Sequence, residues 1–203
     1  LLFGCIIVLL IVVLLLGNWR SGLVIASLIP LSLFFTISMM YLFGIDANLM
    51  SLGALDFGII IDGAVIIVEF IAVKLTLQQN ELQKAAGDEK QTIMDRITFS
   101  GASKMMNSAI FGQLIILIVF IPILSLTDVE GKMFRPMALS FSFALLGAMF
   151  FGLTWLPVAA SLFLKPVPEE KKFRITRWIM SMVHRTYEPV IEWSYNHKKI
   201  ILG

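Results

Sequence analysis

Three carboxylic acids, Asp56, Asp62 and Glu69, interrupt an otherwise apolar stretch at residues 49–73. An acidic residue at the centre of a membrane-spanning helix costs about 2.5–3.5 kcal/mol, and such residues commonly mark ion or proton pathways. Low-dielectric surroundings favour the protonated form of a carboxylic acid, so such a group can take up a proton on one side of a membrane and release it on the other. The three acids are therefore candidates for a proton relay.

Helical geometry divides these acids between two faces. At 100° per residue, Gly58, Asp62 and Glu69 fall within about 40° of one another, and Asp62 and Glu69 lie about 10 Å apart along the axis. Asp56 lies about 120° round from Asp62, on the side shared with Gly63. We expect Gly58 and Gly63 to be packing positions, where neighbouring helices can approach the relay.

The alternative is that the acids pair permanently with basic residues on other helices. No Lys or Arg lies within the apolar spans of this chain. A cationic partner inside the membrane would therefore have to come from outside these 203 residues.

The elements that must position these acids are predicted to be membrane-spanning helices. Hydrophobic residues make up 58% of the chain and charged residues only 15%, against about 25% charged in a soluble domain. Apolar runs near the roughly 20 residues that a spanning helix needs occur at about 1–17, 22–43, 49–73, 106–126 and 137–164. Barrel strands would alternate polar and apolar residues instead. The predicted fold class is all-α, a polytopic transmembrane helix bundle over residues 1–164.

The charges predict how the bundle is oriented. Of the 16 Lys and Arg residues, all but Lys132 and Arg135 fall in one set of loops, which the positive-inside rule places in the cytoplasm. We expect the cytoplasmic loop 75–104 to form two short helices around a break at Gly87-Asp88. Residues 165–199 read as a basic amphipathic helix on the membrane surface, or alternatively as a soluble helix against another domain. Because the chain opens and closes in apolar runs, we expect a fragment, with 200–203 beginning a further span.

Two motifs resemble a known family. The first is Asn48–Val65, NLMSLGALDFGIIIDGAV, and the second is Val129–Ala138, VEGKMFRPMA. Both are similar to heavy-metal efflux pumps of the resistance–nodulation–division superfamily, cobalt–zinc–cadmium type. The resemblance covers the whole chain, as the second to sixth helices of the N-terminal half of the transmembrane domain and the surface helix that follows.

The resemblance assigns roles to the acids. Asp62 matches the central proton-carrying residue, and Asp56 and Glu69 match the two flanking acids of the metal branch. Phe70 departs from the pattern, because the family usually has Asn after the Glu. Ile60 and Ile67 stand where a copper or silver pump would carry methionines near the central Asp.

The resemblance implies a proton-coupled secondary transporter that exports divalent heavy-metal cations, and not an enzyme. It implies no cofactor beyond the coupling proton, a homotrimer in the bacterial inner membrane, and contacts with a periplasmic adaptor and an outer-membrane channel; nothing points to nucleic acid. One alternative is a drug or organic-solute pump, which would usually carry adjacent acids where Ile61 precedes Asp62. Another is a protein-translocation relative of the same membrane fold. No metal ligand is nominated, since His184 and His197 lie in the tail at no ligand spacing.

The orientation can be tested by cysteine labelling in the intact protein. Cysteines placed at 44–48 and at 127–136 should react with a membrane-impermeant maleimide added from the periplasm, whereas one at Gly87 should react only after the membrane is opened, because the positive loops stay inside. Labelling of the Gly87 position alone from the periplasm would reverse the orientation.

Overall fold

The computed structural model describes residues 2–45, 57–85 and 87–166, together with positions 178, 181–183, 185, 187 and 189. Asp56 lies outside the described residues, as do the predicted start of a further span at 200–203 and most of the surface helix at 165–199.

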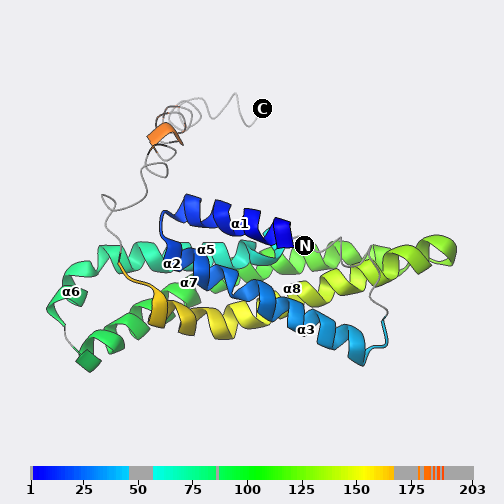
Figure 1. Cartoon of the computed structure of the whole chain (residues 1–203), viewed down its shortest axis with the longest axis horizontal. Helices are drawn as coiled ribbons and strands as arrows, with labels where there is room; N and C mark the ends of the chain where they lie inside the picture. The colour runs from blue at the N-terminus through cyan, green and yellow to red at the C-terminus, as the bar shows by residue number, and fades with distance from the viewer. Residues whose placement is uncertain are drawn as a thin grey trace, which may run out of the picture.

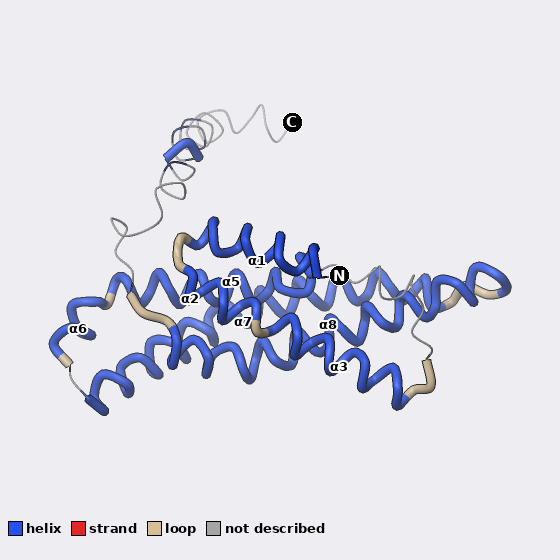
Figure 2. The backbone as a smooth tube through the Cα atoms, in the orientation of Figure 1, coloured by secondary structure: helices blue, strands red, loops and turns tan. Residues whose placement is uncertain are grey.

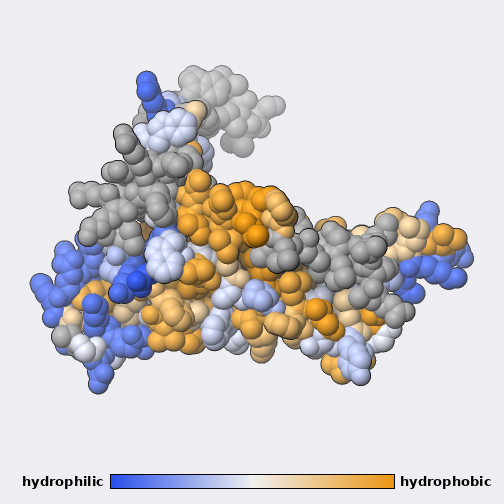
Figure 3. Space-filling view, in the orientation of Figure 1, coloured by the Kyte–Doolittle hydropathy of each residue, from blue (hydrophilic) through white to orange (hydrophobic). Residues whose placement is uncertain are grey.

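The described part of the chain is built from helices, which confirms the predicted fold class (Figures 1 and 2). They are α1 (Leu2–Leu16), α2 (Trp19–Ala26), α3 (Leu28–Leu42), α5 (Phe57–Leu77), α6 (Gln79–Lys84), α7 (Gly87–Leu124) and α8 (Asp128–Phe163). Within the described residues, three stretches are long and apolar enough to cross a membrane: Trp19–Leu42, Gly87–Leu124 and Asp128–Phe163. Figure 3 shows hydrophobic residues in the middle of the molecule and hydrophilic ones toward its two ends.

Helix α5 is the centre of the bundle. It packs against α1, α2, α3, α7 and α8, and Val68, Ile71 and Leu75 on its inner side are fully buried. Helices α7 and α8 run alongside each other, and α3 lies on α8. The acid-bearing helix is thus held by every long helix of the described chain.

The segment 75–104 does not form the two short helices that the sequence predicted. A break does occur at Gly87, which has a φ of +57°, but only α6 is short. From Gly87 the chain continues as one helix of 38 residues to Leu124. The helix can continue because no proline precedes Pro122 in it. Its polar half packs against α5, since a Cβ at Gly101 would lie 3.0 Å from Cγ1 of Ile71. The polar stretch is therefore an extension of the fourth span.

The sequence also predicted an outward loop up to Pro136 and a helix from 137, whereas α8 already begins at Asp128. Thr127 is extended, and Asp128 and Glu130 occupy the first helical turn, where negative charge interacts favourably with the helix dipole. Pro136 is accommodated inside the helix, and its carbonyl accepts a hydrogen bond of 2.7 Å from Ser140 Oγ.

The second span is divided at Ser27 into α2 and α3. Pro30 has no N–H to donate to the carbonyl four residues earlier, which weakens the helix at this point. Ser27 Oγ donates to the Val24 carbonyl at 2.7 Å and accepts from Trp155 Nε1 of α8 at 3.0 Å. The break is therefore held by a hydrogen bond from another helix.

The packing of α3 on α8 can be tested with two glycines of α8. A Cβ at Gly147 would lie 2.8 Å from Cδ1 of Phe35, whereas a Cβ at Gly152 would meet nothing within 4 Å. Alanine favours a helix interior over glycine by about 0.5–1 kcal/mol at either position, but overpacking costs about 1–3 kcal/mol. We expect Gly147→Ala to lower the midpoint of thermal unfolding of the intact protein in detergent, and the control Gly152→Ala to leave it unchanged or higher. Equal midpoints for the two variants would contradict this packing.

Candidate functional site

One face of α5 carries both described acids. Asp62, Ile66, Glu69 and Val73 follow one another at helical spacing, and all four are exposed in this chain. We call these four residues the acidic stripe. Every other face of the helix is occupied, since Ile61, Ala64, Ile67 and Val68, for example, are all buried.

The structure thus places Asp62 and Glu69 on one side of α5, while Gly58, a turn before Asp62, is half-buried. Asp56 is outside the described residues, so its predicted position on a second face stays a prediction.

Gly63, next to Asp62, lies where α5 approaches α7. A Cβ at this position would lie 3.2 Å from Nε2 of Gln113 and 3.5 Å from Cβ of Ala109. Gln113 is only 8% exposed, although it stands in an apolar part of α7. A cavity of about 10 Å³ adjoins both residues, which is about the space of one water molecule. Sequence reasoning missed Gln113; the signal was a lone amide in an apolar span.

Phe70, the residue that departs from the family pattern, holds two cations. The ammonium groups of Lys74 and Lys104 each lie 5.7 Å from the centre of its ring, within the range of a cation–π interaction. Lys74 Nζ also donates a hydrogen bond of 2.8 Å to Ser100 Oγ of α7. Phe70 follows Glu69 directly, so two positive charges are gathered at the end of the acidic stripe that the charge bias assigns to the cytoplasm.

The groups of this arrangement are ones that can exchange protons and carry charge. Carboxylates can bind and release protons, and the lysines set a positive field at one end of the stripe. In the described part of the chain no three His, Cys, Asp or Glu side chains lie together in a way that could hold a metal ion.

The whole chain, residues 1–203, matches the AcrB/AcrD/AcrF family. It is 45% identical to the cobalt-zinc-cadmium resistance protein CzcA of Cupriavidus metallidurans, over 100% of this chain and 18% of that protein. It is 41% identical to protein HelA of Legionella pneumophila, over 100% of this chain and 19% of that protein.

The fold matches a solved structure as well. The crystal structure of a heavy metal efflux pump superposes with a TM-score of 0.59 and 33% sequence identity, covering 76% of this chain and 14% of that one. The chain therefore spans less than a fifth of the length of these relatives.

The contact between α5 and α7 beside Asp62 is open to a double-mutant cycle. Gly63→Leu should push Gln113 aside and lower the free energy of unfolding of the intact protein by the roughly 1–3 kcal/mol that overpacking costs. Gln113→Ala frees space at the same contact, so the double variant should recover part of that loss. If the two changes are additive, the residues do not share the contact described here.

Proposed function

Because the chain belongs to the AcrB/AcrD/AcrF family, we propose that it is the part of a proton-coupled transporter that carries the relay carboxylates. The predicted resemblance to heavy-metal efflux pumps of the resistance–nodulation–division superfamily is confirmed by the family match and by the 45% identity to a cobalt-zinc-cadmium resistance protein. The proposed activity is antiport, in which protons enter and a divalent heavy-metal cation leaves.

The acidic stripe is the observation that carries this proposal. It presents two carboxylates on the one face of α5 that the described helices leave uncovered. If lipid covered that face, exposing an acidic side chain near the helix centre to it would cost about 2.5–3.5 kcal/mol. A face of this kind is therefore expected to meet further protein or a water-filled path in the whole transporter, as intramembrane acids usually do.

The roles follow from position along α5. Asp62 is the proton carrier, and Glu69 passes the proton at the cytoplasmic mouth, next in sequence to Phe70, whose ring contacts Lys74 and Lys104. A protonated stripe is neutral and a deprotonated one is charged, so each proton transfer changes which neighbouring surface the stripe favours. That change of preference is the step that couples proton entry to the transport cycle.

The substrate and assembly are proposed from the family. The similarity to a cobalt-zinc-cadmium resistance protein supports divalent cations as the cargo of this transporter. The isoleucines at 60 and 67 offer no thioether for soft monovalent ions. We further propose a homotrimer in the bacterial inner membrane that works with a periplasmic adaptor and an outer-membrane channel.

Substitution of the acids one at a time tests the proposal in the reconstituted full-length transporter. Asp62→Asn should abolish both proton flux and metal export, because an amide cannot exchange a proton. Glu69→Gln should slow proton release but retain part of the transport, since water can bypass a residue at the mouth. Asp56→Asn should reduce metal export more than proton flux, because it lies on the other predicted face.

The fluxes are measured at matched protein density, with Glu130→Gln on the exposed start of α8 as the control carboxylate. Wild-type export by the Asp62→Asn variant would refute the proposal. Equal loss of both fluxes in all three variants would instead show that the acids act as one coupled cluster.

A further inference from the structure

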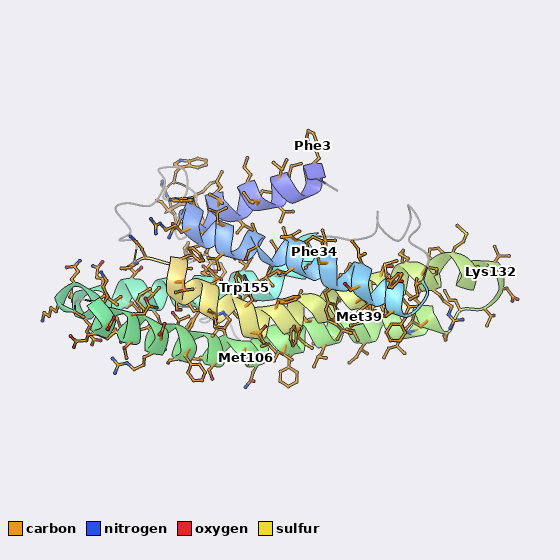
Figure 4. All side chains as sticks on the ribbon, turned by 60° about the horizontal axis from the view of Figure 1, so that its bottom comes forward. Phe3, Phe34, Met39, Met106, Lys132 and Trp155 are labelled. Atoms are coloured by element: carbon orange, nitrogen blue, oxygen red, sulfur yellow. The ribbon has the colours of Figure 1, made fainter. Side chains whose placement is uncertain are left out.

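A groove of about 500 Å³ lies between α2 and the last turns of α8. It is remote from the acidic stripe in sequence and is lined by none of its residues. Figure 4 shows Trp155, one of the lining residues, on α8 near α2 and α3. The groove runs from Arg20, on the side that the charge bias assigns to the cytoplasm, to the helix break at Ser27.

The mouth of the groove carries the positive charge of Arg20. The guanidinium of Arg20 lies 5.5 Å from the centre of the Trp19 ring. Among the described residues the one ion pair joins Arg96 to Glu81, so no described carboxylate lies within 4.0 Å of Arg20. No carboxylate of the described residues therefore occupies Arg20, and its planar fork suits a phosphate group.

The walls of the groove are apolar, and both hydrogen-bond donors at its inner end are already used. Leu23, Val24, Ala159 and Phe163 line the sides. At the inner end, the indole N–H of Trp155 is already donated to Ser27 Oγ. A ligand with a hydrogen-bond acceptor at its inner end would find no donor there, whereas a hydrocarbon chain needs none.

We propose that this groove is a binding site for one anionic phospholipid of the cytoplasmic leaflet, with its phosphate at Arg20 and an acyl chain between Leu23 and Phe163. The volume falls within the roughly 300–1,000 Å³ of ligand sites. Basic pockets between membrane helices on the cytoplasmic side are suited to anionic headgroups, and tryptophans favour the level of the headgroups. A positively charged mouth and apolar walls together match an amphiphilic ligand. Neither feature alone would select such a ligand.

The charge also argues against the other candidate occupant, the tail of this chain. Residues 165–203 carry eight Lys and Arg residues against four Glu residues, a net charge of +4. A segment of net positive charge is repelled by Arg20 at the mouth, whereas a phosphodiester is attracted to it.

The test is lipid retention by the purified full-length transporter. The protein is reconstituted into phosphatidylcholine nanodiscs that contain a known fraction of phosphatidylglycerol, and the lipid that stays bound is identified by native mass spectrometry. The wild type should retain one phosphatidylglycerol per copy of the chain. Arg20→Gln should weaken its binding about fivefold, since one basic residue near an anionic surface contributes about that factor. Leu23→Trp fills the groove from α2 without removing a hydrogen bond, and it should displace the lipid.

Arg135→Gln is the matched control, because it removes an arginine from the opposite end of α8 and should change nothing. Inorganic phosphate should not displace the lipid, since the acyl chain supplies part of the binding. The proposal is overturned if the wild type retains phosphatidylcholine equally well, if Arg20→Gln binds like the wild type, or if no lipid is retained, as occupation of the groove by the chain's own tail would produce.

Discussion

The cost of placing a carboxylate in apolar surroundings governs how α5 can sit in this bundle. Its buried positions are filled by residues such as Val68, Ile71 and Leu75, each 0% exposed, while both described acids lie on the remaining face. A rotation of α5 by half a turn would put Asp62 and Glu69 into the apolar core at a cost of several kcal/mol. The five helices around α5 therefore fix the direction of the acids by packing its other faces.

Close packing in this chain relies on small and hydroxyl-bearing residues. Thr36 Oγ1 donates to the Ser32 carbonyl at 2.7 Å, and Ser142 Oγ to the Ala138 carbonyl at 2.7 Å, so these buried hydroxyls are satisfied by their own helices. Ser140 Oγ additionally lies 3.3 Å from Met40 Sδ across the contact between α3 and α8. Lipid does not drive membrane helices together as water would, so short side chains and van der Waals contact must do so.

The sequence predicted correctly those features that depend on the length of an apolar run or on the spacing of residues along a helix. The runs free of charge predicted the helical bundle, and the spacing of Asp62 and Glu69 predicted their common face. It failed for the polar half of α7 and for the start of α8, because a charged helical extension and a charged loop have the same hydropathy. The contact of Gln113 with Gly63 and the pair of lysines around Phe70 could not be predicted, since each depends on which residues of α5 and α7 meet, and that register is set by packing.

The uninterrupted helix α7 has a mechanical consequence. Its 38 residues make a rod about 57 Å long, roughly twice the 30 Å of a bilayer's hydrocarbon core. One half contacts α5 beside Asp62 through Gln113, and the other ends at the corner with α6. A rod that pivots by 10° displaces a point about 26 Å from the pivot, the length from Lys104 to Gly87, by about 4–5 Å. A small tilt of α7 would thereby be enlarged at its Gly87 end, which the charge bias assigns to the cytoplasm, as at the long arm of a lever.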